Sequence, residues 1–422
     1  MTDRLPRSPA RQRVLRAITL LAALALAGCT TVLARNAVPE ALLAESKPYG
    51  IDVPLLRYSG DRLDQRDLAD VFAGRKALFQ RIHAPQIARG ETIELVSLAL
   101  SGGGPDGAFG AGLLAGWTER GDRPQFQLVT GVSTGAIIAL FAFLGPEHDA
   151  KLREIYTTYE TRDLVVPAIF AGLTGGTALL DASGYRRLIE QYITPEIVER
   201  IAAEYEKGRV LLIGTTNIDS SQPVTWNIGA IAASGHPMAR TLIHDVIQAS
   251  SAIPAAFPPA IIPVEAGGRV YDEMHVDGGA TQQVILYSPG LPVGVLDAAA
   301  GARVKRTIYV IVNNKLRKAY EPARPRVFSI AAKAGSSLIS GSGTGDLYKI
   351  FAIAERDGME LNVRAIPTDF TMASESAFDP RYMSALYRLG YEMGRVGEVW
   401  QPYPPGWVPR EELEARIAAT AD

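Results

Sequence analysis

A short segment near residue 130 constrains the fold more than any other part of the chain. Residues 126–130 are an apolar run typical of a β-strand, residues 134–144 are an uncharged run typical of a buried helix, and Gly131-Val132-Ser133-Thr134-Gly135 lies between them. Glycine on either side of Ser133 removes the side chains that would collide where a strand and a helix cross closely. We therefore predict a strand–turn–helix unit that holds the Ser133 hydroxyl above a sheet. The plainer alternative is a turn in which Ser133 only caps the helix.

Strand-like and helix-like segments alternate along the rest of the chain. Further strands are predicted at 93–100, 209–216, 307–312 and 360–365, and further helices at 64–79, 108–119, 241–252 and 380–394. This alternation predicts an α/β fold with a central, mostly parallel sheet that is covered by helices on both faces. Hydrophobic residues make up 47% of the 422 residues and charged residues 21%, a composition that supports a core of this kind.

Charge and metal-binding side chains exclude several classes of function. The formal net charge is −2, from 43 basic and 45 acidic residues, so no cationic field is available to bind nucleic acid. The single cysteine, Cys29, excludes intramolecular disulfides and multi-cysteine zinc sites. Five histidines leave little room for a histidine-rich metal cluster. We expect neither a metal nor another cofactor.

The first 28 residues have the composition of an export signal. Five arginines precede residue 17, and the uncharged apolar run that follows at 17–27 is shorter than a transmembrane helix needs. The sequence Leu26-Ala27-Gly28-Cys29 resembles the lipobox of bacterial lipoproteins, in which the cysteine is acylated and becomes the new N-terminus. Thr30 replaces the aspartate that retains such proteins at the inner membrane in some bacteria. We expect a chain anchored by lipid at Cys29 in a bacterial envelope, on the periplasmic side of the outer membrane. An ordinary secretory peptide or a short membrane anchor is the alternative.

A glycine-rich loop at 101–107 (S-G-G-G-P-D-G) follows the predicted strand 93–100. Three of its glycines match G-x-G-x-x-G, which would indicate a dinucleotide site. The acid that such a site needs about 20 residues later is misplaced, because Asp122 precedes the next strand instead of ending it. An oxyanion hole is the better interpretation, since consecutive glycines let backbone N–H groups converge on one oxygen. Its predicted residues are Gly102, Gly103, Gly104 and Gly107.

A serine nucleophile needs a base, and the positions of the histidines exclude the usual one. The α/β-hydrolase order places histidine last, yet no histidine lies between residues 278 and 422. Val276-Asp277-Gly278-Gly279 instead offers a carboxylate in a tight turn. A partly desolvated carboxylate has a raised pKa and can act as a base for serine. A hairpin turn without catalytic role is the alternative for this motif, and His275 is the fallback base.

These motifs together resemble the patatin-like phospholipase family. The glycine loop, G-V-S-T-G and D-G-G occur in the family's order, and residues 249–259 (A-S-S-A-I-P-A-A-F-P-P) are similar to the stretch before the family's aspartate. The resemblance covers residues 91–290 and implies a three-layer α/β/α fold. It further implies hydrolysis of lipid acyl esters by a Ser–Asp dyad, with Ser133 as nucleophile and Asp277 as general base. Four glycines would support the dyad: Gly131 and Gly135 in the nucleophile elbow, and Gly278 and Gly279 in the aspartate turn.

Asp106 departs from the family pattern, because the family's glycine loop usually has a basic residue there. Backbone donors do not depend on that side chain, so we expect the oxyanion hole to persist and anionic headgroups to be repelled. The leading hypothesis is a membrane-anchored serine esterase that acts on phospholipids or lysophospholipids. A non-catalytic lipoprotein that binds lipid or a protein partner with the same fold, and an acyltransferase, are the alternatives.

The chain is predicted to have four parts. They are a signal peptide at 1–28, a tether and N-terminal extension at 29–90, the catalytic domain at 91–290 and a C-terminal continuation packed on it at 291–422. The uncharged segment 164–180 is either buried core or a lid that takes acyl chains from a membrane. Residues 334–346, rich in Gly and Ser, are predicted to be a surface connection or a mobile loop.

Overall fold

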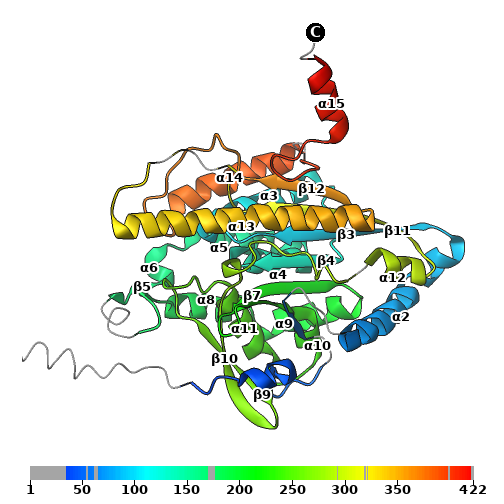
Figure 1. Cartoon of the computed structure of the whole chain (residues 1–422), viewed down its shortest axis with the longest axis horizontal. Coiled ribbons are helices and arrows are strands. Elements are labelled where there is room, and N and C mark those ends of the chain that lie inside the picture. Colours follow the sequence, from blue (N-terminus) through cyan, green and yellow to red (C-terminus); the bar gives the residue numbers. More distant parts are fainter. Residues whose placement is uncertain are drawn as a thin grey trace, which may run out of the picture.

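A mixed β-sheet forms the centre of the protein. The computed structural model describes residues 35–53, 56–60, 65–169, 176–291, 293–317, 320, 322–397 and 400–419. Within these residues a ten-stranded sheet has the order β1-β9-β10-β7-β4-β3-β11-β12, and β8 pairs with both β7 and β2 (Figure 1). Its strands are β1 (Lys47–Pro48), β2 (Arg57–Ser59), β3 (Thr92–Leu100), β4 (Leu128–Val132), β7 (Val210–Asn217), β8 (Gln222–Asn227), β9 (Ala260–Ala266), β10 (Arg269–Asp277), β11 (Arg303–Val312) and β12 (Glu360–Ala365). A separate two-stranded sheet joins β5 (Val166–Pro167) to β6 (Leu180–Asp181).

The middle of the sheet is parallel. Strands β7, β4, β3, β11 and β12 are neighbours in that order and run in the same direction, whereas β8, β10, β9, β1 and β2 join one side as antiparallel strands. The carboxyl ends of parallel strands meet at one edge of a sheet, which is where α/β folds place their ligands. The loops that follow β3, β4 and β11 therefore lie close together.

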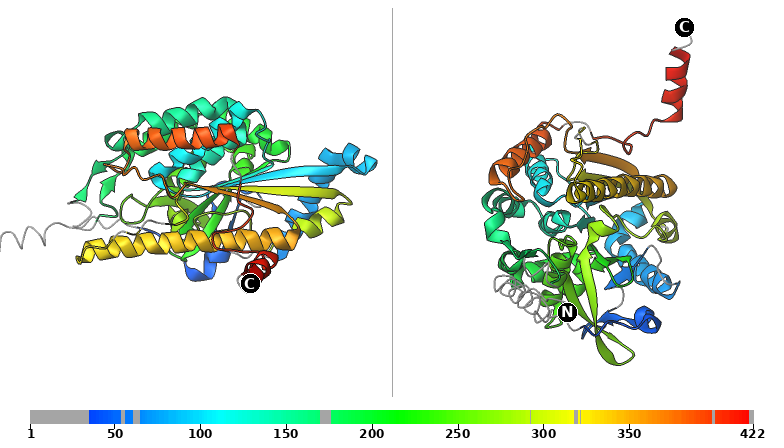
Figure 2. Two further views of the ribbon diagram at one scale, coloured as in Figure 1. Left: turned by 90° about the horizontal axis from the view of Figure 1, so that it is seen from above. Right: turned by 60° about the vertical axis from the view of Figure 1, so that its left-hand side comes forward.

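Helices cover both faces of this sheet, as the sequence predicts for an α/β/α fold. They are α2 (Gln65–Arg89), α3 (Gly107–Arg120), α4 (Thr134–Leu144), α5 (Asp149–Thr158), α6 (Thr161–Leu164), α8 (Ser183–Tyr192), α9 (Pro195–Glu206), α10 (Ile228–Ala233), α11 (Ala239–Ser250), α12 (Val293–Ala299), α13 (Val327–Asp357), α14 (Pro380–Val396) and α15 (Arg410–Ala419), with 3₁₀ turns η1 (Glu40–Glu45), η2 (Gly104–Asp106), η3 (Pro146–His148) and η4 (Gly278–Ala280). Figure 2 shows the strands between α13 on one side and α14 on the other. Successive side chains of β3 point to opposite faces of the sheet and so contribute to both hydrophobic cores. Leu98 and Leu100 belong to the larger buried cluster, and Ala99 belongs to the cluster under α13.

Helices α3 and α14 pack with their backbones in direct contact. A side-chain carbon added at Gly112 or Gly116 of α3 would strike backbone atoms of Tyr387 or Tyr391 on α14. Two glycines of α14, Gly390 and Gly394, face the backbone of α3 in the same way. Because α3 begins directly after the glycine loop, this contact fixes the loop through its helix.

Two sequence expectations about the C-terminal part need correction. The Gly/Ser-rich segment 334–346 is not a loop but lies inside α13. Gly343 packs at ordinary contact distance against Gln283, whereas added side-chain carbons at Gly335, Gly341 and Gly345 would meet nothing within 4 Å. The helix thus forms despite its weak local propensity, which tertiary packing of its second half overrides.

The second correction concerns the predicted boundary at residue 290. This boundary falls within the central sheet, because β11 lies beside β3 and β12 completes the edge. The N-terminal extension also joins the sheet, through β1 and β2. After β12, Tyr403 and Trp407 pack on Phe351 of α13, and α15 then projects from the domain without a buried residue (Figure 1). In the part of the chain that the structure describes, no helix combines the length and the apolar character needed to cross a bilayer.

Candidate active site

Ser133 occupies a strained turn between β4 and α4. Its backbone angles are φ 55° and ψ −126°, a conformation that side chains other than glycine rarely adopt. The turn is closed by glycine on both sides, since a side-chain carbon at Gly131 would strike the Gly135 backbone and one at Gly135 would lie 2.5 Å from the Leu100 carbonyl oxygen. The strand–turn–helix unit expected from the sequence is therefore present, with Ser133 at its tip.

The side chain of Ser250 fixes this turn through two hydrogen bonds. The Ser133 N–H donates to Ser250 Oγ at 2.9 Å, and the Ser250 hydroxyl donates to the Gly214 carbonyl at 2.6 Å. Ser250 ends α11 and is fully buried. The segment 249–259 was noticed in the sequence only as part of a motif, and the structure gives Ser250 a positioning role that the motif alone did not reveal.

Asp277 ends β10 and lies beside Ser133. Strand β10 pairs with β7 so that Asp277 lies opposite Thr215, and β7 in turn borders β4. The Ser133 side chain lies near enough to Asp277 to lower the pKa of its carboxyl group, and the Gly279 N–H donates to Asp277 Oδ1 at 2.7 Å. Both dyad side chains are buried, each with 6% of its surface exposed. The structure thus brings together the serine and the aspartate that the sequence singled out.

Burial sets the electrostatics of this carboxylate. Loss of solvent raises the pKa of Asp277 to about 6, and the hydrogen bonds from Ser133 and the Gly279 N–H oppose that rise. Neither Gly278 nor Gly279 leaves room for a side chain, because an added carbon would strike the Gly214 backbone or the Gln283 side chain. A carboxylate whose pKa lies near neutrality is suited to accept a proton from a hydroxyl.

His275, the fallback base, belongs to a different cluster. Its Nε2 lies 3.0 Å from Glu273 Oε2 and its Nδ1 lies 3.0 Å from Thr215 Oγ1, while Arg57 pairs with Glu273 at 2.5 Å. The ring is completely buried in this arrangement. Both ring nitrogens are therefore occupied away from Ser133.

The glycine loop lies beside the dyad, with two of its four predicted donors already engaged. The Gly102 N–H donates to the Gln283 carbonyl at 3.0 Å, and the Gly107 N–H donates to the carbonyls of Gly104 and Pro105. For the N–H groups of Gly103 and Gly104, the described residues supply no acceptor. The expectation of four donors is thus narrowed to Gly103 and Gly104, because an N–H bonded to a carbonyl cannot also bind an oxyanion well.

Two asparagines after β11 brace this loop, and the sequence analysis did not single them out. The Asn313 N–H donates to Ser101 Oγ and its amide donates to the Ser101 carbonyl, both at 2.8 Å. The Asn314 amide donates to the Gly102 carbonyl at 3.0 Å. Gly103 passes so close to the Asn313 carbonyl that any side chain would collide with it. The sequence signal that could have identified these asparagines is their position directly after the strand β11.

Asp106, at the position where a basic residue was expected, faces the C-terminal part of the chain. The Tyr382 hydroxyl of α14 donates to Asp106 Oδ1 at 2.6 Å. Burial, and next the charge of Asp106, raise the pKa of Tyr382 above its ordinary value, so the phenol stays protonated as the donor. Asp106 is thus tied to α14 rather than to the Ser133–Asp277 pair.

Comparison with known proteins relates part of the chain to a family. Residues 98–289 match the family model of patatin-like phospholipases, so this region is similar to a patatin-like phospholipase domain. Among solved structures, VipD from Legionella pneumophila is similar at 14% identity, with 72% of this chain and 66% of that chain covered and a TM-score of 0.34. No curated protein sequence matches the chain.

Proposed function

We propose that this protein is a serine-dependent lipid acyl hydrolase in which Ser133 is the nucleophile and Asp277 the general base. Similarity of residues 98–289 to the patatin-like phospholipases supports lipid hydrolysis in general. The observation that carries the particular proposal is the placement of Ser133, in its strained turn, beside the buried Asp277 carboxyl group. A serine next to a base of this kind is an activated nucleophile.

The chemistry follows from the positions of these groups. Asp277 accepts the Ser133 proton as the hydroxyl oxygen attacks the ester carbonyl, and the negative charge that develops on the carbonyl oxygen is bound by the N–H groups of Gly103 and Gly104. Collapse of this intermediate transfers the proton from Asp277 to the leaving alcohol and leaves an acyl-serine. Water, deprotonated by Asp277, then attacks the acyl-serine, and Asp277 returns this proton to the Ser133 oxygen as the fatty acid is released. No metal or cofactor takes part in this scheme.

Exposed apolar side chains near the dyad support a lipid substrate. Val166 and Ile169 each have 57% of their surface exposed, and Leu179 follows in the same hairpin. The Leu179 N–H donates to the Ala255 carbonyl, which joins this hairpin to the segment after Ser250. Residues 170–175, which belong to the segment 164–180 named above as core or lid, lie outside the described residues. Apolar side chains exposed beside an active site suit contact with a lipid surface.

The chain that leads into α13 is rich in basic residues, and the first half of α13 exposes apolar side chains. Val327, Ile330 and Leu338 are exposed there, and Figures 1 and 2 place this end of α13 on the same side as β5. Residues 313–345 contain six basic residues and one acidic residue, although the whole chain has a net charge of −2. We therefore propose phospholipid or lysophospholipid in a membrane surface as the substrate class.

Covalent labelling tests the catalytic part of this proposal. A fluorophosphonate probe should label the folded, delipidated protein, since an activated hydroxyl attacks phosphorus as it attacks an ester. Ser133→Ala should abolish the label, and Ser183→Ala, which changes an exposed serine at the start of α8, should retain it. Equal labelling of wild type and Ser133→Ala would reject Ser133 as nucleophile. Release of fatty acid from phospholipid and lysophospholipid vesicles then assigns the substrate.

We also propose a lipid anchor at Cys29, which lies outside the described residues. Five residues separate Cys29 from Arg35, where the chain is fixed by an ion pair to Asp219 at 2.6 Å. The six Cα-to-Cα steps from Cys29 to Arg35 reach about 20 Å when extended, so such an anchor would hold the domain close to the membrane. Cys29→Ala should release the protein from the membrane fraction or leave it unprocessed. Unchanged membrane recovery and processing would contradict the anchor.

A further inference from the structure

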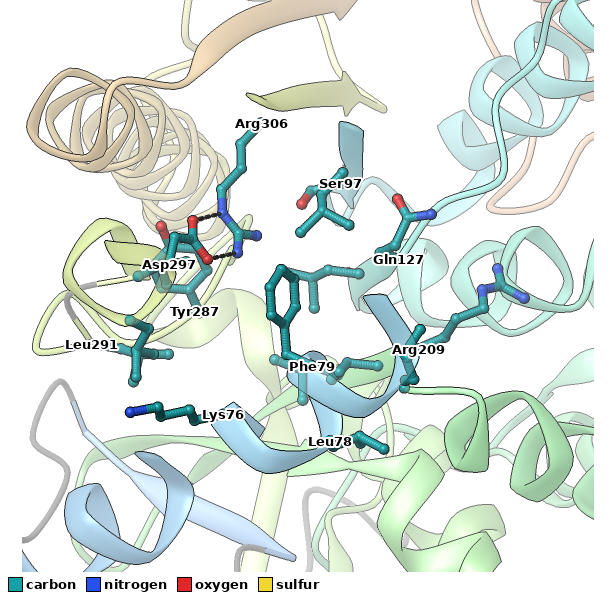
Figure 3. A pocket seen from close by; sticks show the side chains of 18 of the residues that line it. Lys76, Leu78, Phe79, Ser97, Gln127, Arg209, Tyr287, Leu291, Asp297 and Arg306 are labelled. Carbon is teal, nitrogen blue, oxygen red and sulfur yellow. Dashed lines mark hydrogen bonds and ion pairs between the residues drawn. The ribbon is translucent and has the colours of Figure 1, made fainter. Parts of the chain in front are cut away.

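A cavity of about 450 Å³ lies toward the amino ends of the strands, away from Ser133. Its floor is the face of the sheet that carries Leu95, Leu128 and Leu212, and Phe79 and Ile82 of α2 cover it. Figure 3 shows the Phe79 ring pointing into the space between α2 and the sheet. The proposed catalytic scheme makes no use of this cavity.

The floor and the cover of the cavity are apolar. The leucines of the sheet and the side chains of Phe79 and Ile82 offer no hydrogen-bond partners, although polar side chains such as Ser97 and Gln127 also line the cavity. The volume lies within the range of small-molecule sites and corresponds to roughly fifteen groups of the size of a water molecule or a methylene. One long hydrocarbon chain fits such a space.

The cavity also carries an excess of positive charge. Four cationic side chains line it, against two carboxylates; the cations are Lys76, Lys207, Arg209 and Arg306, and the carboxylates are Glu204 and Asp297. Arg306 is paired with Asp297 through two hydrogen bonds of 2.8 and 2.7 Å, which Figure 3 marks. Glu204 is shared by Lys207 and Arg209. Within the described part of the chain, no carboxylate lies within ion-pair distance of Lys76. One anionic headgroup at Lys76 would reduce this excess from two positive charges to one.

We propose that this cavity binds one fatty acid, with the hydrocarbon chain between α2 and the leucine floor and the carboxylate at Lys76. A fatty acid satisfies both observations, since its chain is apolar and its head carries one negative charge at neutral pH. Fatty acid is also what the proposed hydrolysis releases, yet binding at this second site does not require catalysis. Binding would stabilise the contact of α2 with the sheet, because a ligand that binds only the folded state stabilises it.

Binding is tested with a fluorescent polyene fatty acid on the full chain carrying Ser133→Ala. We expect saturable binding, competed by palmitate and at least about tenfold less by the uncharged palmityl alcohol. Leu128→Trp fills the floor and should weaken binding at least about tenfold, and Leu413→Trp, which adds the same ring to an exposed site on α15, should not. Lys76→Gln should weaken binding of the acid but not of the alcohol, and Lys151→Gln on α5 is its matched control.

A second arm separates this site from the catalytic one. Wild-type protein blocked at Ser133 by the fluorophosphonate should bind the probe as tightly as the Ser133→Ala variant does. The proposal is overturned if binding is not saturable, if the block abolishes it, or if Leu128→Trp and Lys76→Gln, both folded by circular dichroism, bind like their controls. Because Lys76 is exposed, Lys76→Gln keeps the test decisive even if Leu128→Trp fails to fold.

Discussion

The two ends of the central sheet are built in opposite ways. At the carboxyl ends, backbone meets backbone, as where Gly135 lies against the Leu100 carbonyl, and the buried polar groups of Ser133, Ser250 and Asp277 each have partners. At the amino ends of the same strands, Leu128 borders an open cavity of about 450 Å³. The sheet is therefore closely packed at the end where we propose that a proton moves from Ser133 to Asp277, and it borders an open cavity at the other end. A substitution that adds volume should therefore lower the free energy of unfolding at the carboxyl ends and have little effect, or raise it, at the amino ends.

The largest effect is expected from Asp277→Asn. The amide keeps the shape of the carboxylate but cannot accept the Ser133 proton, so ester turnover should fall about 10²–10⁴-fold. Asp272→Asn, a partly exposed carboxylate on the same strand, is the matched control and should retain turnover. Turnover is measured on a small soluble ester, with folding checked by circular dichroism. Near-normal turnover in folded Asp277→Asn would remove the aspartate from the mechanism.

A pair of volume-adding substitutions sharpens the comparison. Gly135→Ala should lower the free energy of unfolding by about 1–3 kcal/mol or more, because the new carbon meets backbone that cannot rotate away. Leu128→Phe, at the floor of the cavity, should change it by less than about 1 kcal/mol or raise it. Urea unfolding measures both. If Gly135→Ala and Leu128→Phe lowered the free energy of unfolding equally, the two ends of the sheet would be packed with equal density, contrary to this comparison.

The pH dependence follows from the raised pKa of Asp277. Its carboxylate must be ionised to act as base, so kcat/KM should be level above pH 6 and fall about tenfold per pH unit below it. The free energy of unfolding should instead fall as pH rises. The folded state holds this proton up to about pH 6 and the unfolded state only to about pH 4, so ionisation of Asp277 destabilises the fold as pH rises between them. At pH 7 Asp277→Asn should be more stable than wild type by roughly 3 kcal/mol. An activity profile flat from pH 4 to 7 would contradict the assignment.

The smallest effect is expected from Asp106→Ala. The predicted oxyanion donors are backbone groups of Gly103 and Gly104, so turnover of a neutral ester should stay within a few-fold of wild type. Tyr382→Phe removes the other half of the contact with α14 and is the companion variant. A loss of more than about 100-fold in either, the size of a lost oxyanion donor, would show that the loop depends on this side chain.

The sequence predicted the site better than it predicted the edges of the sheet. Ser133, Asp277 and the glycine loop belong to short motifs whose spacing survives any uncertainty about element boundaries. Strands β9 and β10 were not predicted, because Pro263 in β9 and the charged residues of β10, such as Arg269 and Asp272, mask the apolar alternation of a strand. The helix at 334–346 was missed for a related reason, since glycine and serine are weak helix formers and only tertiary contacts decide the outcome.

What the sequence could not provide were partners distant along the chain. Ser250 and Asn313 act through hydrogen bonds to residues more than 100 positions away, and no local pattern announces such pairs. The same holds for the two donors of the glycine loop that are already engaged, because the carbonyl bound by Gly102 belongs to Gln283. The motif identifies the loop, and only the folded chain shows which of its N–H groups are available.

The position of β11 beside β3 has a consequence for the order of folding. Residue 92 pairs with residue 303, so the centre of the sheet closes only across a very long stretch of sequence. Contacts of this kind form slowly, since the entropy of closing the chain must be overcome before they stabilise anything. Asn313, which braces the glycine loop, follows the same strand. A nascent chain that already contains Ser133 and Asp277 therefore lacks a completed site, and activity should begin only when the last third of the protein has joined the sheet.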